Sequence, residues 1–285
     1  MSDVITYDDL PPNVQSKLAP LYQACDFKRY GDVITGLSKI IDKYPSYVHG
    51  AFVLGMALRE SGHAARASKR FVAAAKVAPR DPRVLLGLAW SRLDVKDFKG
   101  ARRFATQALR KAEPLYRGDV VSVLAMAAEA EGKNDQAAKL YLEAYEVGTK
   151  RRWLKAHCQL AGVEYALDES DTYVPWPIKP RVRRQMYATI GRGLVDAARA
   201  KNPDVPDESV LITGCDGTAG LTGRWARSAD VDRALLYQAL AARGGYCDCE
   251  VLMNAADNDD EVAERRETKA KAPTRRRKSK TKKAS

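Results

Sequence analysis

Apolar residues recur every three or four positions from about Val14 to about Leu167, a spacing that is typical of amphipathic helices. The clearest stretch is 48–81, where two apolar faces flank the turn residues 61–63. The first face contains Ala51, Leu54, Gly55 and Leu58, the second contains Ala67, Phe71 and Ala74, and Pro79 follows. The pattern predicts two short helices that touch closely, because small residues lie where the backbones must meet.

This unit is repeated along the chain with a period of 34 residues. The pairs that share this spacing are Gly55 and Ala89, Ala67 and Ala101, Ala74 and Ala108, and Pro45 and Pro79. The pattern returns after 36 residues at 137–144 and is weaker at 14–47, where Pro20 and Leu21 replace a Leu-Gly pair. One helix pair cannot bury its apolar face alone, so the repeat predicts a stacked array.

The repeat resembles the tetratricopeptide repeat (TPR), which has this period and small residues at the helix crossing. The resemblance covers about 14–168 and implies a mostly α fold: a TPR-like α-solenoid of four helical hairpins, then a helix from about Arg152 to Leu167. We expect a polar lead-in at 1–13, repeats at 14–170, and a Pro-rich elbow with a basic helix at 171–206. A small α or α+β module at 207–256 and a disordered tail at 257–285 complete the expected organisation.

In the tetratricopeptide family the first helix of each pair lines the concave surface of the solenoid. The resemblance therefore implies a groove that binds a protein or peptide and is lined by His49, Phe52, Met56, Arg59, Arg83, Leu86, Trp90, Leu93, Asp119, Ser122, Met126 and Glu129. Phe52, Met56 and Trp90 would form an apolar stripe that suits a peptide. Arg59 and Arg83 beside it would suit an acidic residue of that peptide. The alternative is that the three stripe residues pack on one another or against the elbow.

Three of the five cysteines fall in the module, in Gly214-Cys215-Asp216-Gly217-Thr218 and in Gly244-Gly245-Tyr246-Cys247-Asp248-Cys249-Glu250-Val251. This stretch resembles a bacterial domain family of uncharacterised function, DUF2695, which has a Cys-Asp-His-Thr motif before a Gly-Gly-Tyr-Cys-Asp-Cys-Glu-Val motif. The chain departs from that pattern at Gly217, where the family has His. Cys215, Cys247 and Cys249 could bind zinc with Asp216, Asp248 or Glu250 as a fourth ligand.

The Cys-x-Cys spacing differs from that of ordinary structural zinc ligands and from that of thioredoxin-like pairs. A redox thiol therefore stays an alternative, as does a set of small buried side chains with capping Asp residues. An enzyme would need a base and a pocket, and the pattern does not define them. We expect no catalytic activity and no obligatory cofactor.

Charge is spread unevenly along the chain, whose formal net charge is +12. Residues 268–285 carry nine Lys or Arg and no acid, which leaves only +3 for the rest. The tail could bind nucleic-acid phosphates weakly, or it could serve only as a solubilising segment. The cations concerned are Arg275, Arg276, Arg277, Lys278, Lys280, Lys282 and Lys283.

An odd number of cysteines and an acidic N-terminal stretch argue against a secreted disulfide framework. No apolar run is long enough to span a bilayer. We therefore expect a soluble, cytoplasmic interaction scaffold without a membrane partner. The alternatives are a metal or redox module carried on a repeat scaffold and a nucleic-acid-associated protein that acts through its tail.

Overall fold

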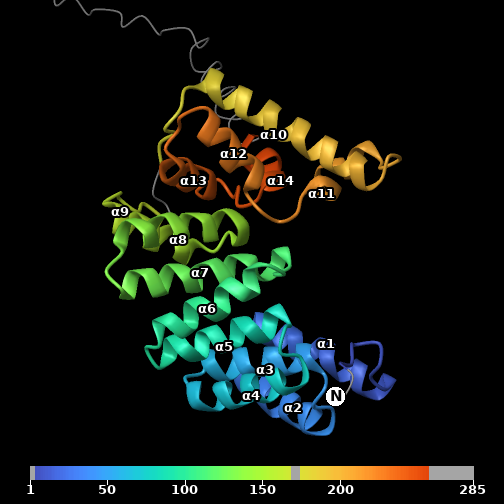
Figure 1. Cartoon of the computed structure of the whole chain (residues 1–285). Coiled ribbons are helices and arrows are strands. Elements are labelled where there is room, and N and C mark those ends of the chain that lie inside the picture. Colours follow the sequence, from blue (N-terminus) through green and yellow to red (C-terminus); the bar gives the residue numbers. More distant parts are fainter. Residues whose placement is uncertain (1–3, 168–173, 257–285) are drawn as a thin grey trace, which may run out of the picture.

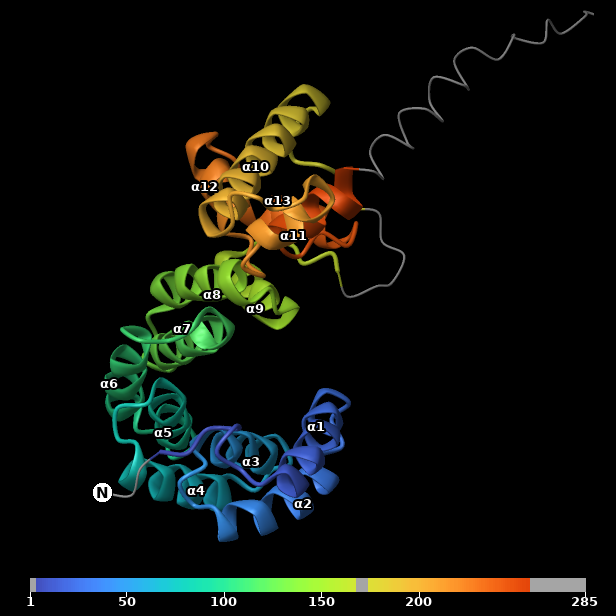
Figure 2. The ribbon, with the colours of Figure 1, turned by 90° about the vertical axis from the view of Figure 1, so that its right-hand side faces the viewer.

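The computed structural model describes residues 4–167 and 174–256, and its first nine helices form a curved stack (Figures 1 and 2). They are α1 (Pro12–Asp26), α2 (Tyr30–Lys43), α3 (Val48–Glu60), α4 (Ala64–Val77), α5 (Pro82–Asp94), α6 (Phe98–Leu109), α7 (Pro114–Ala130), α8 (Asn134–Gly148) and α9 (Arg151–Ala161). Figure 2 shows α1, α3, α5 and α7 on the concave side and α2, α4 and α6 on the convex side. The predicted TPR-like solenoid is confirmed.

The turn inside each hairpin uses a residue with a left-handed backbone. Lys28, Gly62, Lys96 and Gly132 hold this position in successive hairpins, with φ between 58° and 83°. Gly162, with φ of 68°, ends α9 by the same device, and Val163 N–H donates to the Cys158 carbonyl. The last helix of the solenoid is therefore shorter than predicted, because the sequence pattern alone did not reveal this stop.

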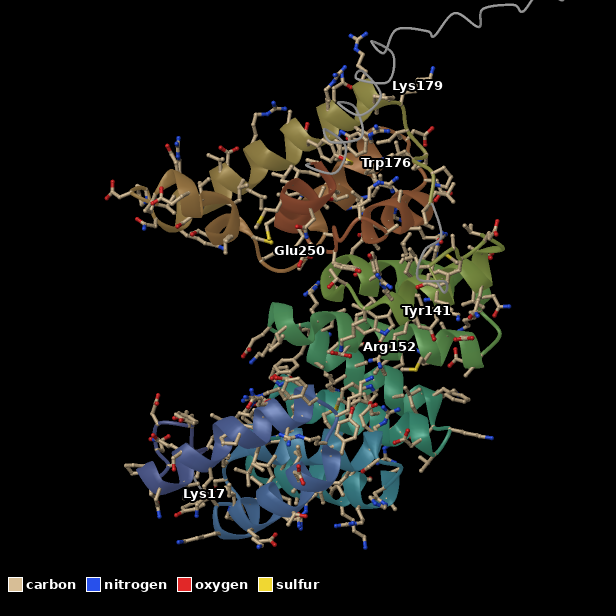
Figure 3. All side chains as sticks on the ribbon, turned by 180° about the vertical axis from the view of Figure 1, so that it is seen from behind. Lys17, Tyr141, Arg152, Trp176, Lys179 and Glu250 are labelled. Atoms are coloured by element: carbon tan, nitrogen blue, oxygen red, sulfur yellow. The ribbon has the colours of Figure 1, made fainter. Side chains whose placement is uncertain are left out.

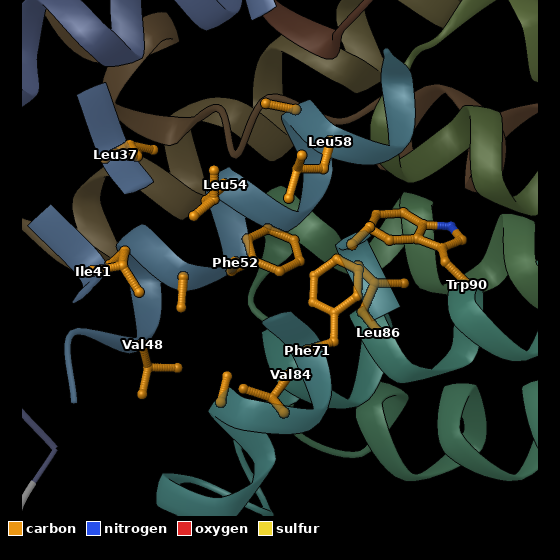
Figure 4. Close-up of a cluster of buried hydrophobic side chains, with 14 of the residues drawn as sticks. Leu37, Ile41, Val48, Phe52, Leu54, Leu58, Phe71, Val84, Leu86 and Trp90 are labelled. Atoms are coloured by element: carbon orange, nitrogen blue, oxygen red, sulfur yellow. The ribbon is translucent and has the colours of Figure 1, made fainter. Parts of the chain in front are cut away.

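Phe71 of α4 holds three helices together (Figure 4). Its ring fits between Gly55 of α3 and Gly87 of α5, where a Cβ atom would lie 2.3 Å and 2.2 Å from ring carbons. The small residues that revealed the repeat thus leave room for an aromatic side chain of the neighbouring helix. Phe71 is buried, and burying a side chain of this type contributes about 2 kcal/mol relative to leaving it exposed.

The C-terminal part, 174–256, is helical in every regular element that the structure describes there. It contains α10 (Pro180–Lys201), η1 (Asp207–Ser209), α11 (Val210–Gly214), α12 (Gly220–Ser228), α13 (Arg233–Ala241), α14 (Asp248–Glu250) and the π-helical turn η2 (Val251–Ala256). Of the two options for the module, the α option is therefore the one observed. The long basic helix α10 buries Met186, Ile190, Leu194 and Ala198 and leaves its arginines on the other faces.

The hydrophobic core of this C-terminal part continues into the end of the solenoid. One buried cluster joins Val121, Tyr145 and Trp153 of α7–α9 to Leu194 of α10 and Tyr237 of α13. A separate cluster fills the first three hairpins and reaches Val123 of α7. Since an end repeat exposes an apolar face, the C-terminal helices act as the cap that covers it.

Candidate functional site

Two of the three stripe residues, Phe52 and Trp90, are buried against each other and against neighbouring aromatic rings (Figure 4). Phe52 stacks on Trp90 with a centroid distance of 6.2 Å and meets Tyr116 edge-on at 5.3 Å. The prediction that Phe52 and Trp90 are open groove contacts is wrong. The physical reason is that the curvature of the stack brings α3, α5 and α7 together on their inner side.

Three further predicted groove residues are buried, namely Leu86, Asp119 and Ser122. Half-buried positions remain, and among the predicted set they are His49, Met56, Arg59, Arg83, Leu93 and Met126. Glu129 is exposed, and it accepts a hydrogen bond from Tyr141. The concave face therefore hides Phe52 and Trp90 of the stripe, and it offers Met56 together with the half-buried side chains around it.

The two arginines of this face already have carboxylate partners within the chain. Arg59 pairs with Asp94 at 3.2 Å and lies over the Trp90 ring, and Arg83 pairs with Asp81 at 2.6 Å. Burial alone would raise the pKa of Asp81, but the Arg83 hydrogen bonds outweigh it and lower that pKa. The expectation that Arg59 and Arg83 are free to take an acidic peptide residue is therefore not supported.

Glu146 joins the solenoid to its cap. Its buried carboxylate accepts hydrogen bonds from Tyr237 at 2.9 Å, Arg233 at 2.5 Å and Arg227 at 3.1 Å. Its backbone carbonyl accepts the Ala219 N–H at 2.7 Å. Arg151 donates to the Tyr246 hydroxyl nearby. These contacts hold the loop that contains Cys215 against the corner between α8 and α9.

Two clefts border the loop 215–218 at this junction. The larger, about 750 Å³, lies between the start of α7, the α8–α9 corner and the loop, and its lining includes Leu115, Tyr116, Asp119, Lys150, Trp153 and Asp216. The smaller, about 420 Å³, is lined by α10, α12 and the solenoid. Asp216 and Val147 line both clefts. Leu115 was not among the predicted site residues, because the pattern around the helix-starting Pro114 does not show whether this apolar side chain is exposed.

The three cysteines of the module converge beside these clefts. The Sγ atoms of Cys215, Cys247 and Cys249 all lie within 4.8 Å of one another, and those of Cys247 and Cys249 are 3.3 Å apart. Burial raises the pKa of Cys247 and of Cys249. Figure 3 shows the neighbouring Glu250 at the edge of the module nearest the solenoid. The sequence proposed this set of thiols, and the fold brings them together.

The acidic residues around the thiols hold the backbone. Asp216 Oδ1 accepts hydrogen bonds from the N–H and hydroxyl of Thr218, and Glu250 accepts the N–H groups of Tyr246 and Cys247. Asp248 accepts from the start of α12, at Leu221 N–H, Thr222 N–H and the Thr222 hydroxyl. The group of converging ligand atoms contains the three thiols and none of these carboxylates.

The predicted nucleic-acid residues, 275–283, lie outside the described residues. Among the helices that the structure does describe, none is long and apolar enough to cross a membrane.

Comparisons with known proteins match the C-terminal module. Residues 205–254 fit the model of the family DUF2695, described as a protein of unknown function, which confirms the resemblance predicted at 207–256. An uncharacterized protein of Mycobacterium bovis and two of Mycobacterium tuberculosis strains are each 43% identical over 51 residues. That match covers 18% of this chain and 52% of theirs, so the chain spans about half the length of the curated relatives it matches.

Among solved structures, the crystal structure of MamA protein aligns with 52% of this chain and 86% of its own, at 12% identity and a TM-score of 0.38.

Proposed function

We propose that this protein is a noncatalytic scaffold that binds a segment of a partner protein on the concave face of its solenoid, with the larger junction cleft as the anchoring point. The observation that carries the proposal is the cleft itself. A volume of about 750 Å³ at the end of a curved helical array can take several side chains of a peptide. Stacked helical repeats generally bind their ligands on such extended concave surfaces.

The lining of the cleft favours a segment with an apolar side chain next to a Lys or Arg. Leu115 is 75% exposed at the rim, and the half-buried ring of Tyr116 lies beside it. Three carboxylates, those of Glu113, Asp119 and Asp216, line the cleft. Asp119 is buried and paired with Lys150 at 2.8 Å and with Arg152 at 3.6 Å, so Glu113 and Asp216 carry the negative charge offered to a partner. A basic residue of the partner would meet this charge.

We place the scaffold in the cytoplasm. All five cysteines are free thiols in the structure, a state that is stable in a reducing compartment. Binding of the partner needs no catalytic group, and the proposal assigns none.

Affinity capture tests the proposal. The tagged full chain is used to recover proteins from a nuclease-treated native lysate, so that proteins bridged by nucleic acid are removed. Leu115→Asp should lower the affinity for the recovered partner by at least about tenfold, which corresponds to 1.4 kcal/mol. Leu115 lies in the first turn of α7, where an aspartate is compatible with the helix, so the variant should keep its helicity.

Val95→Asp is the matched control, because Val95 is 67% exposed and lies at the end of α5, outside the cleft. Its affinity should stay within about twofold of the wild type. Equal affinities of wild type and Leu115→Asp, measured by calorimetry with the purified partner, would refute the cleft as the anchoring point.

A further inference from the structure

The sulfur atoms of Cys215, Cys247 and Cys249 are arranged as ligands of one metal ion. A thiolate bound to Zn²⁺ lies about 2.3 Å from the metal, so two thiolates of a tetrahedral site lie about 3.8 Å apart. The observed separations, from 3.3 Å to at most 4.8 Å, bracket that value. The Cys-x-Cys spacing along the sequence spoke against zinc, but the separations between the three sulfur atoms are compatible with it.

The two segments that carry the thiols are fastened to each other. The Asp248 N–H donates to the Thr218 carbonyl at 2.9 Å, and the Asp248 carboxylate holds the start of α12. Gly217, with φ of 75°, turns the loop so that its N–H donates to Cys215 Sγ at 3.4 Å. The backbone N–H of Glu250 donates a hydrogen bond to the side chain of Cys247 at the start of α14. Such N–H donors stabilise bound thiolates and orient them.

Among the described residues, three thiols and no carboxylate converge at this point, and thiolates prefer soft or borderline ions such as Zn²⁺. Binding of a divalent cation replaces the thiol protons and compensates the thiolate charges. All three cysteines are partly accessible, which leaves a way in for an ion and room for a fourth ligand such as water.

We propose that Cys215, Cys247 and Cys249 form a three-thiolate site for a thiophilic divalent cation, Zn²⁺, at the junction between the solenoid and its cap. The ion links the loop 215–218 to the start of α14. Because Asp216 lines both clefts, the ion would fix the wall of the site at which the partner is proposed to bind. The metal proposal rests on the thiols alone and does not require the proposed function.

Metal content of the purified full chain tests this site directly. Protein prepared under reducing, anaerobic conditions should contain about one zinc per chain by elemental analysis. Apo-protein titrated with Co²⁺ should develop thiolate-to-cobalt charge-transfer bands that saturate at one equivalent and disappear when Zn²⁺ is added. These measurements on the wild type need no variant to fold.

Variants then assign the ligands. Cys215→Ser and Cys249→Ser should each lower zinc affinity by at least about 100-fold, while circular dichroism confirms that the helices persist. Cys25→Ser is the matched control, because Cys25 is a half-buried thiol of α1, outside the group of three. This variant should keep the wild-type zinc content. No zinc and no cobalt bands in reduced wild type would overturn the proposal. Full zinc retention in Cys215→Ser and Cys249→Ser, or a Cys247–Cys249 disulfide formed in place of metal binding, would overturn it as well.

Discussion

The Glu146 carboxylate offers the sharpest test of how the solenoid and its cap are joined. It is a buried anion that accepts from one hydroxyl and two guanidinium groups of the cap. Replacement by glutamine keeps the size of the side chain and one acceptor oxygen, but removes the charge. The hydrogen bond from the Ala219 N–H to the Glu146 carbonyl involves backbone atoms only, so Glu146→Gln leaves it in place and tests the carboxylate alone.

The magnitude follows from the exposure of the partners. Arg227 is 49% exposed and can turn to solvent, so its pairing contributes little. Arg233 is 26% exposed and Tyr237 is buried, and hydrogen bonds to a charged group contribute about 1.5–3 kcal/mol each. Glu146→Gln keeps part of each bond. We expect a loss of about 3 kcal/mol in the free energy of unfolding, and a fall of about 6 °C or more in Tm.

The assay combines urea denaturation, followed by circular dichroism, with hydrogen exchange. The loss of protection should concentrate in α12 and α13, because those helices carry the guanidinium and hydroxyl partners. Glu143→Gln, an exposed acid of the same helix, is the control and should change stability by less than about 0.5 kcal/mol. Indistinguishable unfolding of the two variants would refute the reasoning.

Two further changes test the solenoid. Gly87→Ala places a Cβ atom 2.2 Å from a Phe71 ring carbon and should lower the free energy of unfolding, measured by urea denaturation, by about 1–2 kcal/mol. Gly31→Ala places its Cβ atom in open space and should raise the free energy of unfolding by up to about 1 kcal/mol. A change of the same sign in both variants would contradict the packing. Burial, with Arg83 as a second cause, lowers the pKa of His49, so the unfolded chain binds more protons and stability falls as pH drops through about 6.5. His49→Gln should therefore lose less stability than the wild type between about pH 7.5 and pH 5.5, and equal losses would refute this.

The repeat could be predicted because each helix pair repeats the same local requirement. Small residues at 55, 67 and 74 return one period later, and the neighbouring backbones can approach closely only there. The residue with a left-handed backbone in each turn could be predicted only in part, since two hairpins have Gly at this position and two have Lys. A conformation that Lys adopts at some cost leaves a weaker mark in the sequence than one that needs Gly.

The candidate site was predictable in its chemistry but not in its surroundings. The motif residues Cys215, Cys247 and Cys249 could be named in advance, because thiols next to turn residues form a local pattern. Neither the exposure of Leu115 nor the burial of Trp90 could be read in that way. Both depend on how strongly the stack curves, and curvature arises from small rotations added over successive repeats.

The sequence by itself determined the paired helices of the repeats and the identity of the thiols, because these depend on residues close together in the chain or on the repeated spacing. Only the tertiary structure decided which inner side chains are covered, how Glu146 fastens the cap, and that Cys215 meets Cys247 and Cys249 at metal-binding distance. Contacts between segments separated by dozens of residues depend on the packing of everything between them, and no local pattern encodes that packing.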